Sequence, residues 1–481
     1  MIERGIAGLV VFTPLALAGV PVWSSSLMQI ASFVLFGIWL HKASRETTII
    51  LESGTLLKLF GLFIILVVLQ LLPMPMRLLE VISPGSAAIY RNAGDEVSGS
   101  WYPISLYRQA TLNELLNLLA NGAVFVVVSN HYRSKEQILP LIRTIVILGC
   151  LLVVVAVLQK ANWNGRIYWF YPIDPSLQSR ISYIWGPYIN RNHFAGYLEM
   201  VIPLALGLVM YTLTRAGQDK GRTALRRLSS LASHKKLPAF ALSVLAVVVM
   251  SGALFATLSR GGILGFTAST AVFVIMMRSR RSLRRKTGVL ILLGLTVAVV
   301  GLFAAWDRIE SRFMDLADEK HIMRTQVWSD LTGMVRDYPV LGTGLGTFDR
   351  AFPRYQSKYS TTMFEHAEND YLEVLADTGI MGFTLAIASG IVFIVTMYRA
   401  WRSRRNSLAI SFGAAGIASC LAIAVHSFTD FNLRIPANAL LLTTITALTS
   451  SCLIRGREQR TSFDKIQPHA DRSLTAVSDN G

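Results

Sequence analysis

Charged residues are scarce in this chain of 481 residues. Lys, Arg, Asp and Glu make up only 16% of it, whereas 52% of its residues are hydrophobic. Soluble domains carry roughly a quarter charged residues, so the shortage excludes an ordinary soluble protein and predicts a polytopic membrane protein. Because a lipid-embedded bundle is one unit, a domain count based on length does not apply.

Cysteine is also scarce, with only Cys150, Cys420 and Cys452, and each lies in an apolar run. Cysteines in such runs are typical of small core residues, so neither a disulfide framework nor a zinc site is indicated. The carboxylates of DLADE (315–319) lack the Asp-x-Asp pattern that commonly holds a divalent ion on a nucleotide sugar. No nucleophile elbow of the form Gly-x-Ser-x-Gly appears either. We therefore expect no metal and no cofactor.

Apolar runs of about twenty residues, the length of a membrane span, are abundant. Twelve candidates lie near 5–22, 26–41, 55–72, 111–129, 138–158, 194–214, 238–258, 261–277, 287–305, 372–398, 408–428 and 436–454. The first resembles a signal peptide, with Arg4 ahead of the apolar stretch and small residues near Ala18. We expect an uncleaved span instead, because the sidedness of the loops requires it.

Basic clusters follow every second predicted span. They are HKASR (41–45), HYRSK (131–135), residues 215–236, RSRRSLRRK (278–286), YRAWRSRR (398–405) and RGREQR (455–460). By the positive-inside rule, this alternation places both termini in the cytoplasm. The segments left outside contain 17 Lys and Arg against 16 Asp and Glu, whereas the rest contains 29 against 13. Nearly all of the net charge of +17 is thus cytoplasmic, where anionic membrane lipids account for it and nucleic acid is not needed.

The predicted outside segment 306–371, between the ninth and tenth spans, is large enough for a small helical subdomain. Within it, apolar residues recur at helical spacing and predict an amphipathic helix along the membrane surface; they are Met323, Val327, Leu331, Met334 and Val335. We expect three regions: N-terminal helices with two outside loops (1–185), a transmembrane core (186–455), and a disordered cytoplasmic tail (456–481).

Two segments bring polar residues to the outer ends of spans. In GPYINRNHFAGYLEM (186–200), Arg191, Asn192 and His193 stand at the water boundary and Glu199 falls about two turns inside. A snorkelling Arg191 is the ordinary interpretation, but an interior Glu199 needs a partner in hydrocarbon, which favours a functional role. In LSRGGILG (258–265), Arg260 lies on a predicted tight turn. Such a turn accounts for the two glycines that follow Arg260, but it does not account for the arginine itself. An arginine fixed there, beside backbone N–H groups at a helix start, suits a phosphate.

A third candidate lies in 321–348, where Arg324 on the amphipathic helix precedes GTGLG. This glycine run lacks the strand and helix of a dinucleotide site, so a turn is predicted. FEHAENDYLEVLADTG (364–379) then places Glu365, His366, Glu368, Asn369 and Asp370 at the mouth of a span. A solvated helix N-terminus explains the acids. It does not explain the histidine, the side chain best suited to move a proton near neutral pH.

His366 and Asp370 are one helical turn apart and could share a face. HSFTDFNLRIP (426–436) adds His426, Asp430 and Arg434 at another outer end, where Asp430 and Arg434 could instead simply pair with each other.

The motifs together resemble the O-antigen ligase family of lipopolysaccharide ligases and the related O-antigen and exopolysaccharide polymerases. The matching pieces occur in the family's order between 186 and about 445. They are NRNHFAGYLEM, LSRGG, RTQVW with YPVLGTGLGTF, HAENDYLEVLADTGIMG and HSFTDFNLRIPANALLL. The resemblance implies a metal-independent membrane glycosyltransferase with a GT-C-like fold in the bacterial inner membrane. Its donor would be a glycan on undecaprenyl diphosphate at the periplasmic face, and its acceptor the lipid A core or a second lipid-linked glycan.

The resemblance also implies roles for residues. Arg191, Arg260 and Arg324 match positions expected to hold the diphosphate, and His366 matches the histidine expected to assist the acceptor hydroxyl. Arg191, Arg260 and His366 are the expected catalytic residues. The residues expected to contact diphosphate or glycan are Asn192, His193, Glu199, Arg324, Asp370, His426 and Arg434. Ligase and polymerase stay equally open from the sequence, and a polysaccharide transporter or lipid-linked sugar flippase is the alternative from another class.

Overall fold

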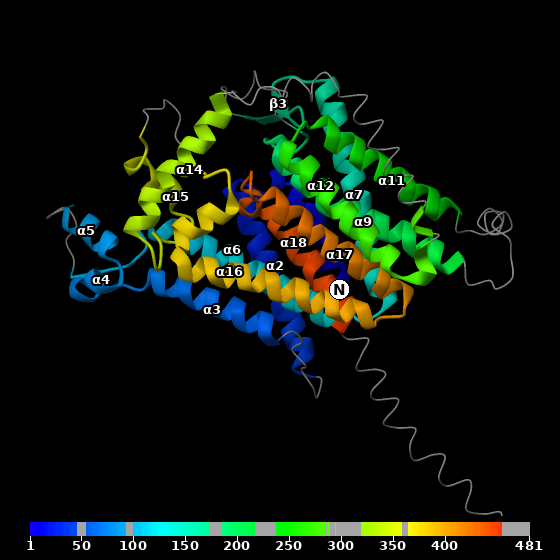
Figure 1. Ribbon diagram of the computed structural model, residues 1–481, viewed down its shortest axis with the longest axis horizontal. Coiled ribbons are helices and arrows are strands. Elements are labelled where there is room, and N and C mark those ends of the chain that lie inside the picture. Colours follow the sequence, from blue (N-terminus) through cyan, green and yellow to red (C-terminus); the bar gives the residue numbers. More distant parts are fainter. Residues whose placement is uncertain are drawn as a thin grey trace, which may run out of the picture.

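Long helices lie side by side in one bundle in the computed structural model of this chain (Figure 1). Apart from helices, the described residues form two small antiparallel strand pairs and one isolated antiparallel bridge, between Trp185 and Tyr188. The strand pairs are β1 (Met74–Pro75) with β2 (Trp101–Tyr102) and β3 (Arg166–Ile167) with β4 (Tyr171–Pro172). The structure describes residues 1–45, 54–92, 100–173, 185–216, 237–284, 286–288, 294, 319–357 and 364–454.

Ten of the described helices are long and apolar enough to cross a membrane. At a rise of 1.5 Å per residue, about 20 residues cover a hydrocarbon core about 30 Å thick. The helices are α2 (Val22–Ala43), α3 (Gly54–Leu71), α6 (Arg108–His131), α7 (Lys135–Ala161), α9 (Arg191–Ala216), α11 (Leu237–Ala256), α12 (Arg260–Ser279), α16 (Asp370–Ser403), α17 (Ser407–His426) and α18 (Pro436–Ile454). The predicted all-α polytopic membrane protein is thus confirmed.

Two of the twelve predicted spans do not appear among these ten. In place of 5–22, helix α1 (Ile2–Leu15) has only 14 residues, followed by a short 3-10 turn (Leu17–Gly19). Leu17 and Ala18 adopt left-handed backbone angles, with φ of 57° and 58°, which end a right-handed helix. Of the predicted span 287–305, almost all lies outside the described residues, as does the predicted tail 456–481. A count of twelve spans stays a prediction.

Helix α9 is the centre of the bundle. Its whole apolar stretch is buried inside the protein, because α7, α11, α12, α17 and α18 all pack against it. Small residues allow the closest of these approaches: a Cβ on Gly207 would lie 3.1 Å from the Phe412 ring of α17. Ser419 of α17 also donates a hydrogen bond to the Met200 carbonyl of α9, at 2.7 Å. Small residues and interhelical hydrogen bonds of this kind hold helices together where the hydrophobic effect between them is weak.

A smaller core lies beside one end of the bundle. Helix α14 (Glu319–Asp337) buries Val327, Leu331 and Met334 against α15 (Phe348–Ala351) and the 3-10 turn Phe352–Arg354. The amphipathic helix predicted from the spacing of these residues is therefore confirmed. The short helices α4 (Met76–Ile82) and α5 (Pro84–Asn92) complete this end of the molecule (Figure 1).

GTGLG forms a turn, as predicted. Gly342, Gly344 and Gly346 all have positive φ, and a Cβ on Gly342 would collide with the backbone of Asp377 in α16. The turn therefore packs directly on α16, and the Gly346 N–H donates to Asp377 Oδ2 at 2.7 Å. Glycine is needed here for both its left-handed conformation and its size.

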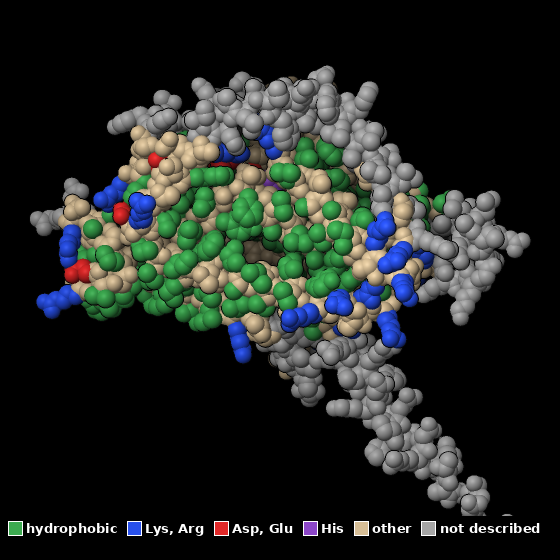
Figure 2. Space-filling model, viewed as in Figure 1, with side chains coloured by type: hydrophobic (Ala, Val, Ile, Leu, Met, Phe, Trp, Pro, Cys, Tyr) green, Lys and Arg blue, Asp and Glu red, His purple; other side chains and the backbone are tan. Residues whose placement is uncertain are grey.

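Basic side chains gather at the end of the bundle opposite α14, along the lower right edge of Figure 2. Arg280, just after α12, stacks its guanidinium over Trp401 of α16 at 4.4 Å and donates to the Arg404 carbonyl at 3.1 Å. Arg404 in turn donates to the Leu453 and Ile454 carbonyls at the end of α18. Arginines thus satisfy the last carbonyls of the helices at this end.

Candidate functional site

Three helices begin and one ends close together at the end of the bundle near α14. Helix α9 begins at Arg191, α12 at Arg260 and α16 at Asp370, while α17 ends at His426. Helices α9, α12 and α17 pack on one another, and α16 packs on α17. Helix N-termini offer unpaired N–H groups and a partial positive charge. This end of the bundle is therefore favourable for a negatively charged ligand.

The turn that carries Arg260 is as tight as predicted, but the conformation of the turn is not what requires its two glycines. Leu258, and neither glycine, takes the left-handed backbone angle, with φ of 56°. Ser259 caps α12 by accepting from the Gly262 N–H at 3.2 Å. A Cβ on Gly261 would collide with the His426 ring and the Thr429 hydroxyl. The glycines are thus required by close packing, which seats the Arg260 turn on His426.

Glu199 has the partner that its position in hydrocarbon requires. Its Oε1 lies 3.1 Å from His426 Nδ1 at the end of α17, and both side chains are buried. A Cβ on Gly265 of α12 would lie 2.5 Å from Glu199 Oε2. The pair therefore occupies the point where α9, α12 and α17 meet. Both side chains are buried, and contact of either of them with a ligand stays a prediction.

Asp430 extends this pair toward the surface. Its Oδ1 lies 3.1 Å from His193 Nε2, and its Oδ2 lies 3.9 Å from His426 Nε2. Burial alone would raise the pKa of the Asp430 carboxyl. The charge and hydrogen bond of His193, with the charges of His426 and Arg324, outweigh burial and hold that pKa below its usual range. Two carboxylates and two imidazoles thus form one continuous buried chain from Glu199 to His193.

His366 is held by a carboxylate that the sequence analysis did not single out. Its Nδ1 lies 2.9 Å from Glu373 Oε1, and the Ala367 N–H donates to Glu373 Oε2 at 3.0 Å. Burial opposes protonation of the imidazole, but the charge and hydrogen bond of Glu373 prevail and raise the pKa of His366 above its ordinary value. His366 and Asp370 do not share a helix face as predicted, because α16 begins only at Asp370. The Asp370 carboxylate accepts from Ser427 Oγ at 2.7 Å.

Arg434 does not pair with Asp430, so that alternative is also wrong. Its Nε lies 3.0 Å from Glu373 Oε1, and a second ion pair joins it to Asp377. Glu114 of α6 lies 3.7 Å away. Only 10% of the Arg434 side chain is exposed, so it neutralises the carboxylates behind His366 and has little surface left for a substrate.

Phe431 joins the two histidine groups. The His366 ring stacks on it with 3.9 Å between centroids and 19° between planes. The His193 ring meets it edge-on at 4.6 Å. One aromatic ring therefore fixes both imidazoles at the same end of the bundle, although they come from α9 and from the loop before α16.

Arg324 reaches this group from α14 and forms an ion pair with Glu368. Asp430 and Arg324 are close enough for their charges to act on each other. Burial and the charge of Asp430 raise the pKa of Glu368 above its ordinary value, against the opposing effect of Arg324. The predicted external arginine thus does lie beside the histidines.

Arg191 and Asn192 begin α9 next to His193. Arg191 is buried, and its charge acts on Lys160 at the end of α7. The Asn192 N–H is held by Asn190 Oδ1 at 2.9 Å. The His193 carbonyl accepts from Asn438 Nδ2 of α18 at 3.0 Å, so the start of α9 is anchored on two sides.

The predicted residues therefore separate into two kinds. Glu199, Asp370, His426 and Arg434 are buried in internal pairs, whereas Arg260, Arg324 and His366 keep partly exposed side chains. Glu373, Asp377 and Phe431 were missed. For the two carboxylates a signal did exist: together with Asp370 they are spaced three and four residues apart inside an apolar helix, which predicts one acidic face in need of a buried cation. Nothing in the sequence distinguishes Phe431.

Within the described residues, no group of three or more His, Cys, Asp and Glu side chains is arranged to hold a metal ion. Arg260 and Arg324 bring partly exposed guanidinium groups to this end of the bundle.

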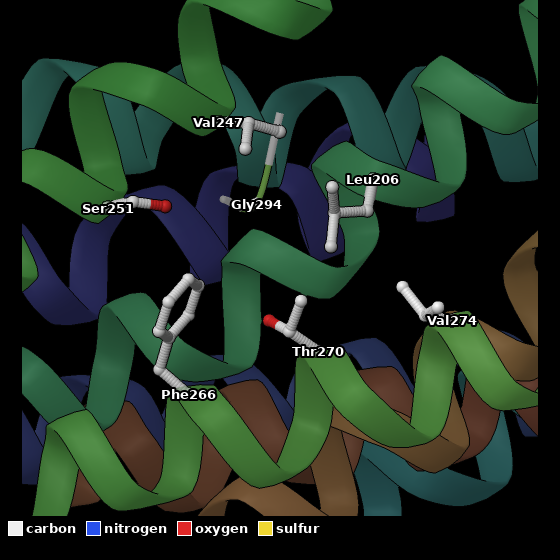
Figure 3. A pocket seen from close by; sticks show the side chains of 7 residues that line it. All are labelled: Leu206, Val247, Ser251, Phe266, Thr270, Val274 and Gly294. Atoms are coloured by element: carbon white, nitrogen blue, oxygen red, sulfur yellow. The ribbon is translucent and has the colours of Figure 1, made fainter. Parts of the chain in front are cut away.

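A separate cavity lies between α9, α11 and α12 (Figure 3). It is lined by Leu206, Val247, Ser251, Phe266, Thr270, Val274 and Gly294. The hydroxyls of Ser251 and Thr270 point into it, and none of the described residues that line it is ionisable. The charged side chains described above lie instead at the helix ends.

Residues 245–387 match a family whose model is described as O-antigen ligase. The matched segment contains Arg260, Arg324, His366 and Glu373. No curated protein matches the chain. The resemblance predicted from the sequence motifs is confirmed over this segment.

Proposed function

We propose that the chain is a membrane glycosyltransferase of surface polysaccharide biosynthesis, because residues 245–387 match the O-antigen ligase family. It moves a glycan from undecaprenyl diphosphate to an acceptor hydroxyl at the periplasmic face of the inner membrane. The observation that carries this proposal is a partly exposed imidazole, His366, held by a carboxylate beside several arginines.

The donor's diphosphate is held by Arg260 and Arg324, with Arg191 at the start of α9. Breaking the bond between the anomeric carbon and the phosphate oxygen leaves an electron pair, and hence negative charge, on the diphosphate. Guanidinium groups in a partly dehydrated site stabilise that charge strongly. The N-termini of α9 and α12 add their partial positive charge. These groups supply the charge stabilisation that the reaction needs, without requiring a metal.

The acceptor hydroxyl is deprotonated by His366. Glu373 holds Nδ1, which leaves Nε2 to take the proton as the acceptor oxygen attacks the anomeric carbon. The products are the new glycoside and undecaprenyl diphosphate, and the anomeric centre inverts in this single displacement. General base catalysis of this kind typically contributes about 10² to 10⁴ in rate.

The distribution of charge supports a periplasmic site. Arginines gather at the ends of α12, α16 and α18, away from the histidines (Figure 2). By the positive-inside rule that end faces the cytoplasm, and the end with Arg260 and His366 then faces the periplasm. The acidic and histidine side chains of α9, α16 and α17 also lie toward this one end. That arrangement favours an enzyme over the transporter or flippase alternative, for which charges near the bilayer midplane are expected.

A transfer assay with the purified chain tests the proposal. Incubation with a lipid-linked glycan and an acceptor should release undecaprenyl diphosphate and form a longer or lipid A-attached glycan. Movement of the glycan lipid across a vesicle membrane, without release of undecaprenyl diphosphate, would instead indicate a flippase.

The nature of the acceptor separates ligase from polymerase. A ligase requires the lipid A core in the assay, whereas a polymerase extends the glycan when a second lipid-linked glycan is the only acceptor. In cells, deletion of a ligase removes all glycan from lipid A, and deletion of a polymerase leaves single repeats.

A further inference from the structure

The carboxylate of Glu368 contacts the guanidinium of Arg324 and would block it from a ligand. The two side chains form an ion pair, and about a third of each is exposed, 33% for Arg324 and 31% for Glu368. Arg324 is an arginine that the proposed function assigns to the donor's diphosphate. A phosphate oxygen and a carboxylate oxygen make the same charge-assisted hydrogen bonds to a guanidinium. Glu368 therefore stands where a phosphate of the donor would bind.

A second carboxylate, that of Asp430, repels any negatively charged group that binds Arg324, whether that group is Glu368 or an anionic ligand. Asp430 acts electrostatically on Glu368 and on Arg324. Asp430 cannot move away, because it is fully buried and paired with His193 at 3.1 Å. Glu368 lies on the loop before α16 and is partly exposed. When a diphosphate arrives, repulsion between the negative charges is relieved only if Glu368 leaves Arg324.

The backbone of Glu368 is also poised to change. Its φ is 53°, in the left-handed region that residues other than glycine and asparagine seldom adopt. Residues on either side are anchored: Ala367 donates its N–H to Glu373, and Asn369 caps α16 by accepting from the Tyr371 and Leu372 N–H groups. Glu368 alone in this stretch combines an unfavourable conformation with a partly exposed side chain, so it can swing outward while His366 stays in place.

We propose that Glu368 acts as an internal substitute for the donor's phosphate, which the diphosphate must displace from Arg324. This inference rests on the proposed function. Its consequence is a lower apparent affinity, because any anion that binds Arg324 must first displace the carboxylate. Glu368 thus sets how tightly the site binds the donor, and it does so by the same factor for each anion that requires the open pair.

Binding of inorganic pyrophosphate and inorganic phosphate to the purified full-length chain tests the proposal without requiring turnover. In Glu368→Gln, both anions should bind more tightly, by about tenfold if the resting pair is closed nine-tenths of the time. The gain should be at least as large for pyrophosphate as for phosphate, because pyrophosphate carries more negative charge. In the transfer assay the same variant should show a lower KM for the donor with kcat nearly unchanged.

Two further variants separate this exchange from a general loss of negative charge. Glu80→Gln removes a carboxylate from a surface ion pair with Arg91 and should leave anion binding unchanged. Arg324→Ala should weaken pyrophosphate binding. Adding Glu368→Gln to Arg324→Ala should leave that weakened affinity unchanged. Unchanged or weaker anion binding in Glu368→Gln, or an equal gain with and without Arg324, would overturn the proposal. If the anion results hold but no glycan is transferred, the proposed function fails and the exchange at Arg324 stands.

Discussion

His366 and Glu373 form a histidine–carboxylate pair whose atoms Nδ1 and Oε1 lie 2.9 Å apart. They come from opposite sides of a helix start: His366 lies in the loop before α16, and Glu373 lies in its first turn. Arg434 binds the same carboxylate oxygen from the turn that follows α17. The loop, the helix and the turn are thereby fixed around one imidazole.

The pH dependence of transfer should report this pair. Glu373 raises the pKa of His366, and a general base acts only in its neutral form, so the rate should rise with pH through that raised pKa. In Glu373→Gln the remaining effect of burial lowers the pKa, and the acid limb should move to lower pH while the maximal rate falls. Asp349→Asn, which alters an exposed pair with Arg350, is the control. An unshifted acid limb in Glu373→Gln would exclude His366 as the group that titrates.

The two arginines Arg434 and Arg324 should behave differently when truncated. Arg434→Ala leaves Glu373 and Asp377 buried without their cation, which costs about 3–5 kcal/mol of unfolding free energy. Arg324→Ala breaks a partly exposed pair, worth about 0–1 kcal/mol, and should instead weaken donor binding. Thermal unfolding in detergent, alongside donor binding, checks both expectations. Equal stability of the two variants would contradict the structural role of Arg434.

Gly265 should be intolerant of even one added methyl group. A Cβ there would lie 2.5 Å from Glu199 Oε2 and 2.8 Å from the Ala422 carbonyl. Gly265→Ala should lower stability by about 1–3 kcal/mol, and it should reduce turnover by shifting Arg260 and His426. Gly252→Ala on the neighbouring helix α11 is a matched control, because nothing lies within 4 Å of its added Cβ. Equal melting temperatures for the two variants would count against the close packing around Glu199.

The sidedness of the site can be measured with single cysteines in a background that lacks Cys150, Cys420 and Cys452. Cysteines at positions 260, 324 and 366 should react with a membrane-impermeant thiol reagent added to intact spheroplasts. Cysteines at positions 281 and 405, in the basic end of the bundle, should react only after the membrane is opened. The reverse pattern would place the site in the cytoplasm.

The helices could be predicted from the sequence, and ionisable residues near their ends could be singled out, because the signals there are strong. Apolar runs of span length predict helices, since lipid offers no other partner for backbone N–H and C=O groups. Arg260 and His366 were identified because each is an ionisable residue that the ordinary role of its segment does not explain. A span over 5–22 was predicted in place of the 14-residue α1, because no glycine before Gly19 indicates the left-handed turn at Leu17 and Ala18.

The partners of the buried ionisable side chains could not be predicted from the sequence. Asp430 and Arg434 are one helical turn apart in the sequence, yet their partners are His193 on α9 and Glu373 on α16. Those partners are far away along the chain, and only the packing of the bundle brings them close. The same packing buries Glu199, Asp370 and His426 in internal pairs, and their contact with substrate stays a prediction.

The central claim is that guanidinium groups bind the donor while His366 performs the proton transfer, and one comparison tests it most directly. Binding of the lipid-linked glycan and its transfer should be measured side by side for His366→Ala and Arg260→Ala. The account predicts that His366→Ala binds the donor as the unaltered chain does but transfers it at least about 10²-fold more slowly, whereas Arg260→Ala loses donor binding as well. Full transfer activity in His366→Ala would contradict it.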